Sequence, residues 1–291
     1  MTLHEHDVQH EDLAKVNAQS LPYQTSRSPL ALLANFIGKT FTIAEWEARK
    51  IRHDATDLVT RAIQPALWIL VFGEVFTRIR AIPTGSKNVS YLEFMAPGIL
   101  AQSVLFISIF AGIAIIWERD LGVIHKFLAS PTPRGSLVLG KALSSGIRAL
   151  PQAIVIYLLA LILGVKMNFN PLALLGVLVF VVMGAGCFST FSLIIACLLK
   201  TRDRVMGIGQ VLTMPMFFAS NAIYPIAIMP SWLQAIAHIN PLTYVVDGLR
   251  SLMLANTAIN MADVSKDFGI LLIVTIVLVT IGAMLYPRIV Q

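Results

Sequence analysis

The chain has 291 residues, of which 56% are hydrophobic and only 13% are charged, and its mean hydropathy is +0.75. Because roughly a quarter of the residues of a soluble domain are charged, this composition excludes a globular cytosolic enzyme. The net charge of +6 is typical of nucleic-acid-binding proteins, but here the basic residues lie in short loops between apolar runs. This distribution indicates orientation in a membrane and predicts no nucleic-acid partner.

Six segments between charged residues approach or exceed the length of about 20 residues that a helix needs to cross a bilayer. Only the first contains an internal charge, Glu74. The segments are residues 62–77, 94–117, 149–165, 167–199, 205–246 and 268–287. We therefore predict an all-α polytopic membrane protein with six transmembrane helices.

An even number of crossings places both termini on the same side of the membrane. With this topology, 16 lysine and arginine residues lie on the side of the termini and six lie on the other side. The positive-inside rule then predicts that both termini are cytoplasmic and that the chain is a multi-pass protein of the cell (inner or plasma) membrane.

The chain before the first span divides into two parts. Residues 1–27 are polar and rich in histidine and acidic residues, which predicts a flexible cytoplasmic tail; without a scaffold such a tail seldom fixes metal geometry, so no metal site is expected. Residues 28–56 place apolar side chains at helical spacing among charged ones, which predicts an amphipathic interfacial helix. Residues 57–291 form the predicted transmembrane domain.

The longest uncharged segment, residues 205–246, is interrupted by Pro225, Pro230 and Pro241. It could hold two spans, but the prolines favour one span followed by a re-entrant or outer helical hairpin at about residues 225–256. Broken backbone at membrane depth is tolerated only where protein or a wet cavity satisfies its polar groups. We therefore expect this hairpin to be packed against the protein.

A short amphipathic helix is predicted after the second span, at about residues 118–130. Its apolar residues recur three or four positions apart, charged residues fill the other face, and Pro131 ends it. The apolar residues are Leu121, Ile124, Phe127 and Leu128. Such a helix can transmit force from a soluble partner; the alternative is a loop helix that lies on lipid headgroups.

Two motifs resemble those of the ABC-2 type exporter permeases, most closely the drug, lipid and glycolipid export branch of the daunorubicin-resistance kind. The first is cytoplasmic and the second lies between the last two predicted spans. They are Glu118-Arg119-Asp120 with Gly122, Leu128, Pro131, Arg134 and Gly140-Lys141, and the run Asn240-Pro241-Leu242-Thr243-Tyr244-Val245-Val246-Asp247-Gly248-Leu249-Arg250. With the predicted helices, the resemblance covers roughly residues 30–290.

The resemblance implies a half-transporter that pairs with a second permease copy, identical or related, and with two ABC ATPase subunits that bind ATP and magnesium. The helix after the second span would then couple the two proteins. His125 departs from the glutamate or lysine found in many members. The implied ATPase-coupling residues are Glu118, Arg119, Asp120, Leu121, Gly122, Ile124, His125, Lys126, Phe127 and Leu128.

The resemblance also implies a substrate path between two permease copies, lined by the first, second and fifth spans. Aromatic and methionine side chains on these segments suit an amphipathic, lipid-like, drug-like or glycolipid substrate better than a free sugar or ion. The candidate path residues are Trp68, Phe72, Phe106, Phe110, Met214, Phe217, Phe218 and Asn221.

The second motif also has a structural interpretation, as an outer structural motif. Asn240 is a good N-cap, Pro241 suits the first position of a helix, and Asp247 and Arg250 are spaced to form an ion pair. Tyr244 completes the motif. A scaffold role and direct contact with substrate are both compatible with this pattern.

No phosphate-binding loop of the form G-x-x-x-x-G-K-[ST] occurs in the sequence, so the chain itself is expected neither to hydrolyse ATP nor to bind a cofactor. The alternatives are an ion-coupled secondary carrier or channel and a membrane-embedded lipid enzyme. The enzyme would need clustered acidic, histidine or serine residues at one membrane face. A carrier would need buried charge, for which Glu74 is the one candidate, and an ion pair with Arg78 explains that residue as well.

Overall fold

The computed structural model describes residues 29–51, 63–73, 75, 90–124, 133–199, 201–255 and 259–287. Residues 1–38 and residues 39–291 form two compact units; residues 29–38 belong to the first, and the packing described below lies within the second. The predicted tail at residues 1–27 and Glu74 lie outside the described residues.

Nearly all described residues are helical, which confirms the predicted all-α class. Apart from the helices, a single β-bridge joins Met167 to Leu254 in the described part. The helices are α2 (Pro29–Ile51), a helix at Ile63–Gly73 that ends in the π-helical turn η1 (Trp68–Gly73), α5 (Tyr91–Ile113), α6 (Ile115–Asp120), α8 (Arg134–Ile162), α9 (Pro171–Leu198), α10 (Arg202–Phe218), the 3-10 turn η2 (Ile226–Ile228), α11 (Ser231–Ile239), α12 (Pro241–Met253) and α13 (Met261–Leu285).

Four of the six predicted spans are helices long and apolar enough to cross a membrane. These are α5 continued by α6 (Tyr91–Asp120), α8, α9 and α13. The other two are shorter among the described residues: the helix at Ile63–Gly73, and α10 with 17 residues. Since α10 begins with Arg202, Asp203 and Arg204, its polar start lowers its hydropathy. These two crossings therefore remain predictions.

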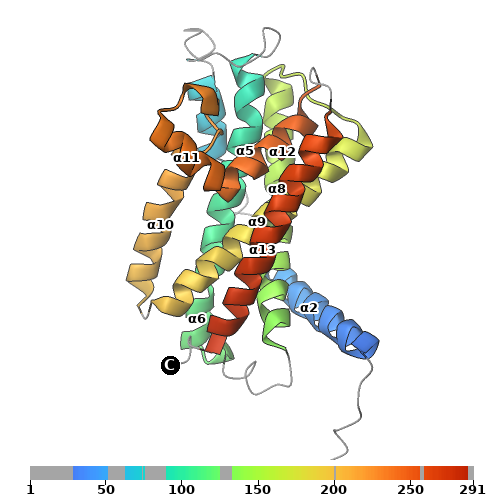
Figure 1. Ribbon diagram of the computed structural model, residues 1–291, viewed down its shortest axis with the longest axis vertical. Helices are drawn as coiled ribbons and strands as arrows, with labels where there is room; N and C mark the ends of the chain where they lie inside the picture. The colour runs from blue at the N-terminus through green and yellow to red at the C-terminus, as the bar shows by residue number, and fades with distance from the viewer. Residues whose placement is uncertain are drawn as a thin grey trace, which may run out of the picture. The chain divides into compact units, whose positions relative to one another are not determined.

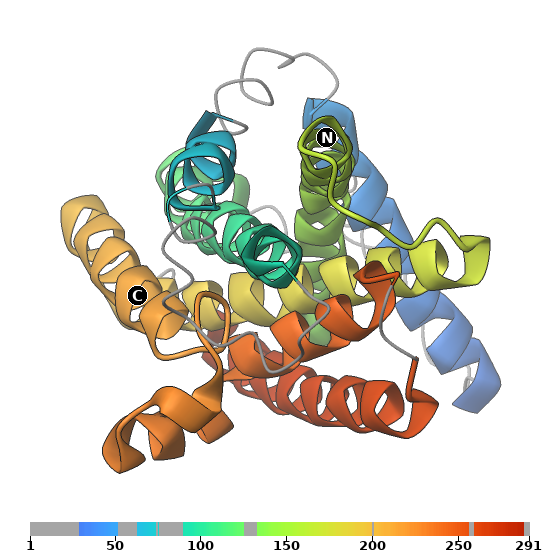
Figure 2. The same cartoon turned by 90° about the horizontal axis from the view of Figure 1, so that it is seen from above.

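The centre of the helical bundle is α5, which packs against α9. In the most apolar part of α5 and α6, 78% of the residues are buried inside the chain, compared with 17% for α13. Gly112 permits the close approach, because a Cβ there would lie 2.3 Å from the Ser189 carbonyl oxygen. At the same contact the Ser192 hydroxyl donates to the Ile109 carbonyl at 2.7 Å. Figures 1 and 2 show α9 crossing between α5 and α13.

The predicted hairpin after the fifth segment consists of two helices, α11 and α12, which meet at Asn240. The chain reaches them from α10 through a turn and η2. α12 packs against α5, α9 and α13, as expected for a segment held by protein. Whether this hairpin re-enters the membrane stays a prediction.

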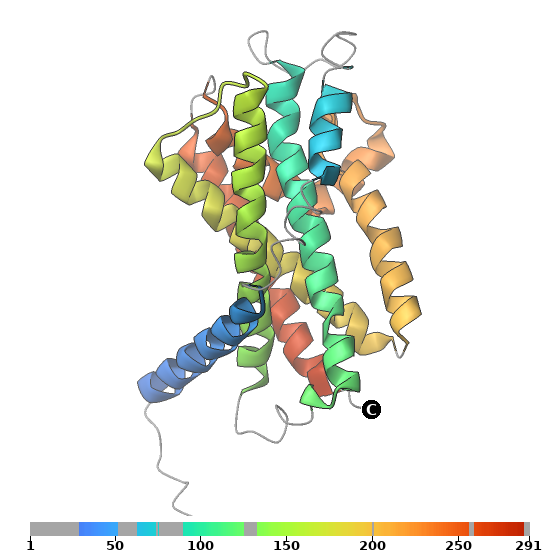
Figure 3. The same cartoon turned by 180° about the vertical axis from the view of Figure 1, so that it is seen from behind.

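The predicted amphipathic segment before the first span is helical, as α2. In its second half Thr40, Ile43 and Ala44 are buried, while Glu45 and Arg49 form an exposed ion pair at 2.7 Å. Ile43 contacts α8 at Gly140, where a Cβ would approach the isoleucine side chain to 2.6 Å. Figure 3 shows the C-terminal end of α2 beside α8. Part of the apolar side of α2 thus packs on protein, while Phe41 is 61% exposed, and the position of the helix at a membrane surface remains a prediction.

Replacing Gly98 with alanine is expected to destabilise the protein by about 1–3 kcal/mol through overpacking. The new Cβ would lie 2.2 Å from the Ala222 carbonyl oxygen, and this backbone contact leaves little room for relaxation. The midpoint of thermal unfolding of the purified protein in detergent measures the effect.

Gly207→Ala in α10 is the matched control, because beyond the neighbouring backbone of its own helix no described atom lies within 4 Å of the new methyl group. Alanine favours a helix over glycine by about 1 kcal/mol, so this variant should be as stable as the wild type or more stable. Equal unfolding midpoints for Gly98→Ala and the wild type would show that the close contact at Ala222 is absent.

Candidate functional site

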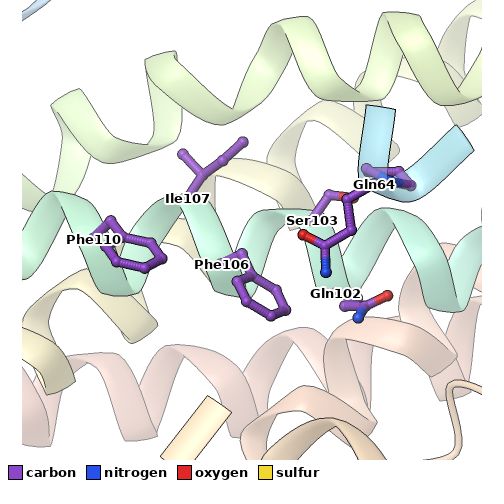
Figure 4. A pocket seen from close by; sticks show the side chains of 7 residues that line it. Gln64, Gln102, Ser103, Phe106, Ile107 and Phe110 are labelled. Atoms are coloured by element: carbon purple, nitrogen blue, oxygen red, sulfur yellow. The ribbon is translucent and has the colours of Figure 1, made fainter. Parts of the chain in front are cut away.

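A cavity of about 320 Å³ lies between the helix at Ile63–Gly73 and α5. Its lining joins polar and aromatic side chains: Gln64, Pro65, Gln102, Ser103, Phe106, Ile107 and Phe110. Figure 4 shows Gln64 reaching from its helix toward Ser103 on α5. The cavity therefore contains two of the predicted path residues, Phe106 and Phe110.

The polar side chains of this cavity differ in their hydrogen bonding. The Ser103 hydroxyl donates to the Ile99 carbonyl at 2.8 Å, one turn earlier in α5. Gln102 is only 3% exposed, and its amide nitrogen has no hydrogen-bond partner in the described part of the chain. Most buried polar groups in proteins are paired, so an unpaired amide beside a cavity calls for a physical explanation.

Four other predicted path residues form a row of aromatic rings. Trp68 stacks on Phe72 with 4.5 Å between ring centroids and meets the edge of Phe217 at 5.7 Å. Phe217 in turn lies 5.5 Å from Phe218. The helix at Ile63–Gly73 and the end of α10 are therefore joined through aromatic contacts.

The last two predicted path residues lie apart from these rings. Met214 is 38% exposed on α10. Asn221 is buried, and its amide donates to the Asp247 carboxylate at 2.5 Å, which ties the turn after α10 to α12. The predicted contact of Asn221 with substrate is untested, but its side chain already serves this internal bond.

The outer motif has the geometry that its sequence predicts. The Asn240 side chain accepts from the Leu242 amide at 3.0 Å as the N-cap of α12, and Pro241 occupies the first helical position. The Asn240 amide also donates to the Met216 carbonyl at 2.7 Å. The Tyr244 hydroxyl donates to the His238 carbonyl at 2.6 Å. Together these bonds hold α10, α11 and α12 at one point.

Arg250 connects the outer motif to α5. Its guanidinium lies 3.4 Å from the Asp247 carboxylate, donates to the Asn221 carbonyl at 2.7 Å, and stands 3.9 Å from the centre of the Phe94 ring. The side chain of Arg250 is only 16% exposed. The predicted ion pair is thus one part of a buried junction between α12, the turn after α10 and the start of α5.

A larger apolar groove of about 730 Å³ lies on another side of α10, among α9, α11 and α13. Phe188 and Phe191 line it from α9, Met216 and Phe218 from the end of α10, and Trp232 from α11. Phe218 is therefore shared between the row of rings and this groove.

At the opposite end of α5, two ion pairs surround α6. Glu118 contacts Lys141 of α8 at 2.5 Å, and both side chains are nearly buried. Asp120 contacts Arg202, the first residue of α10, at 2.5 Å, and also accepts from Arg119 at 3.0 Å. The end of α6 is therefore attached to the starts of both α8 and α10.

The predicted helix at residues 118–130 is wrong in its first part. Glu118, Arg119 and Asp120 end α6, which continues the direction of the second span, and the chain then turns at Gly122, whose φ is +70°. Leu121 is 76% exposed whereas Ile124 is fully buried, so these two residues do not share one face. The predicted coupling residues His125, Lys126, Phe127 and Leu128 lie outside the described residues.

A sequence profile of the ABC-2 type transporters matches residues 39–254, about three quarters of the chain. The chain belongs to the ABC-2 type transporter family. It is therefore a membrane-embedded transport permease, and permeases of this family work with an ABC ATPase.

Three relatives in the ABC-2 family show how far the similarity extends. The transport permease ycf38 of Cyanophora paradoxa is 27% identical over 264 residues, which cover 88% of this chain and 90% of the relative. The daunorubicin resistance ABC transporter permease protein DrrB1 of Streptomyces coeruleorubidus is 24% identical, with 84% and 83% covered. The inner membrane transport permease YadH of Escherichia coli K12 is 24% identical, with 74% and 81% covered.

Gln64, Gln102 and Ser103 of this ABC-2 permease were not predicted from the sequence. The predicted path residues are aromatic and methionine side chains together with Asn221, and these three polar residues were not among them. The signal was present, because a glutamine in the middle of an otherwise apolar span is costly unless it has a partner. Its position beside Phe106 on one helix face could have been found from the spacing of three to four residues.

Proposed function

We propose that this ABC-2 permease is the membrane subunit of an ATP-driven exporter that moves an amphipathic, lipid-like, drug-like or glycolipid molecule out of the cytoplasm or the inner leaflet. The observation that carries the proposal is the cavity of Gln64, Gln102, Ser103 and Phe106, which combines polar and aromatic groups inside a membrane bundle. A bundle with only a structural role could be packed with apolar side chains alone, whereas a binding site for an amphipathic ligand needs both polar and apolar contacts.

The proposed complex contains two permease copies, identical or related, and two ATPase subunits, with both termini of the permease in the cytoplasm of the cell. Phe110 and Phe218, at the cavity and at the end of α10, are 40% and 43% exposed, and a second copy could cover them. The resemblance of the cytoplasmic motif to the corresponding motif of exporter permeases supports transport out of the cytoplasm or the inner leaflet.

In the proposed mechanism, the ATPase subunits transmit force to the permease at the turn after α6. ATP binding would bring the ATPase subunits together and push this turn. Since Glu118 is paired with Lys141 and Asp120 with Arg202, a displacement of α6 would pull on the starts of α8 and α10. α10 then carries the displacement toward Phe217 and Phe218 at its other end, where the aromatic row meets the helix of Trp68.

Co-purification with an ABC ATPase tests this proposal. We expect a stable complex whose ATP turnover rises several-fold when a neutral amphiphile is added, and no ATP turnover by the permease alone. A secondary carrier would instead move its substrate along an ion gradient without an ATPase, and that result would refute the proposed drive.

A further inference from the structure

The polar side chains of the cavity between the helix at Ile63–Gly73 and α5 restrict the chemical class of a bound group more than its aromatic side chains do. Gln102 is only 3% exposed, and its amide nitrogen has no hydrogen-bond partner among the described residues. A buried amide without a hydrogen bond opposes folding, and a bound polar group that pairs with it would remove this penalty. Rotation about the last bond of the side chain lets Gln102 present either its N–H or its carbonyl oxygen.

Ser103 restricts what the bound group can be. Its hydroxyl proton is given to the Ile99 carbonyl at 2.8 Å, so the serine oxygen can only accept a further hydrogen bond. A ligand group facing Ser103 must therefore be a donor, such as a hydroxyl or an amide N–H. Gln64, which reaches toward Ser103 in Figure 4, can serve as donor or acceptor.

The charge of the bound group is restricted as well. None of the seven described residues that line the cavity is ionisable. A phosphate, carboxylate or ammonium group would lose its hydration there without gaining an opposite charge, which is strongly unfavourable at membrane depth. The lining thus favours an uncharged ligand group.

The position of the aromatic rings indicates how a ligand would be oriented in the cavity. Ser103, Phe106 and Phe110 follow one another at helical spacing on α5, and all three line the cavity. The apolar part of a ligand would lie along the two rings, with its polar part against Gln102 and Ser103. A volume of about 320 Å³ is at the lower end for ligand pockets, so it would hold one polar group and the adjoining apolar segment.

We infer that this cavity binds the uncharged, hydroxyl- or amide-bearing end of an amphipathic substrate, with Gln102 as the residue that selects a neutral polar group over a charged one. The inference rests on the proposed transport function for its biological meaning, because it names the substrate class of the same site. Binding itself requires only the permease.

The test is photolabelling of the full-length permease in lipid nanodiscs without any ATPase. The probes are two amphiphiles with the same photoactivatable alkyl chain, one an alkyl glucoside and the other an alkyl phosphate. We expect the glucoside to label the peptide containing residues 99–110 and to be displaced by unlabelled alkyl glucoside. The phosphate should require roughly tenfold higher concentration or more, as expected for an uncompensated charge.

Gln102→Met and Gln152→Met form the matched pair of variants. Both glutamines are 3% exposed, and neither amide nitrogen has a partner in the part of the chain that the structure describes, but of the two only Gln102 lines the cavity. Methionine has nearly the same volume and removes an unpaired polar group, so both variants should fold. We expect Gln102→Met to weaken glucoside binding roughly five- to tenfold and Gln152→Met to leave it unchanged.

The inference is overturned if the phosphate binds as well as the glucoside, if labelling falls outside both residues 99–110 and the helix at Ile63–Gly73, or if both variants bind like the wild type. These outcomes are distinguishable from failure of the proposed function. If specific glucoside binding is found but no ATPase drives transport, the site stands and the exporter proposal fails.

Discussion

Arg250→Met is expected to lower the free energy of unfolding of this permease by about 3 kcal/mol, the largest loss of stability that we predict for a single side chain. Arg250 donates to the Asn221 carbonyl at 2.7 Å, pairs with Asp247 and covers the Phe94 ring. Methionine preserves much of the apolar stem but leaves the Asn221 carbonyl without this donor, and the Asp247 carboxylate loses its cationic partner while keeping the hydrogen bond from the Asn221 amide. Thermal unfolding in detergent measures the loss.

Two further variants separate the contribution of this junction from a general effect of charge removal. Arg250→Lys keeps the positive charge, but the ammonium group of lysine lacks the planar guanidinium that donates to several acceptors at once. This variant should therefore recover only part of the stability. Arg49→Met removes the partner of Glu45 in a pair whose side chains are 77% and 64% exposed, and it should leave the unfolding midpoint unchanged. If Arg250→Met unfolds at the wild-type temperature, the junction does not hold α12 to α5.

Leu121→Ser should weaken attachment of the ATPase by at least about tenfold, the second large effect that we expect. Leu121 is 76% exposed at the turn that follows α6, beside the ion pairs of Glu118 with Lys141 and of Asp120 with Arg202. If the ATPase docks at this turn, as proposed, the leucine side chain would be buried in the interface, where truncation of a large side chain can cost most of the binding energy. The dissociation constant of the purified permease and ATPase measures the effect.

Ile162→Ser is the matched control for Leu121→Ser. Ile162 is 80% exposed at the last residue of α8, about 30 Å along that helix from Lys141. Its replacement removes a similar exposed apolar surface at the opposite end of the bundle, so ATPase binding should not change. Equal weakening by the two variants would indicate a general defect and would remove the support for a partner surface at Leu121.

Local sequence signals predicted much of this structure. The four spans found as long apolar helices come from uninterrupted apolar runs, whose length alone is decisive in a bilayer. Asn240, Pro241 and the pair of Asp247 with Arg250 were predictable because a cap and an i,i+3 pair involve neighbouring residues. The prolines at 225 and 230 likewise indicated the break before α11.

Contacts between residues far apart in the sequence could not be predicted from local sequence signals. Arg250 reaches Asn221, 29 residues away, and Phe94, 156 residues away, so no local pattern links them. For the same reason the sequence did not show that Glu118 pairs with Lys141 or that Asn221 bonds Asp247. The helix predicted from Glu118 failed in its first part because α6 extends the second span to Asp120 and Gly122 then turns the chain.

Transport through this permease requires a separate ATPase if the proposed function is correct. Uptake of the alkyl glucoside into inside-out vesicles that contain the permease, with or without a co-expressed ABC ATPase, measures this requirement. We expect uptake only when permease, ATPase and ATP are all present. Uptake by the permease alone, driven by an ion gradient and indifferent to ATP, would contradict it.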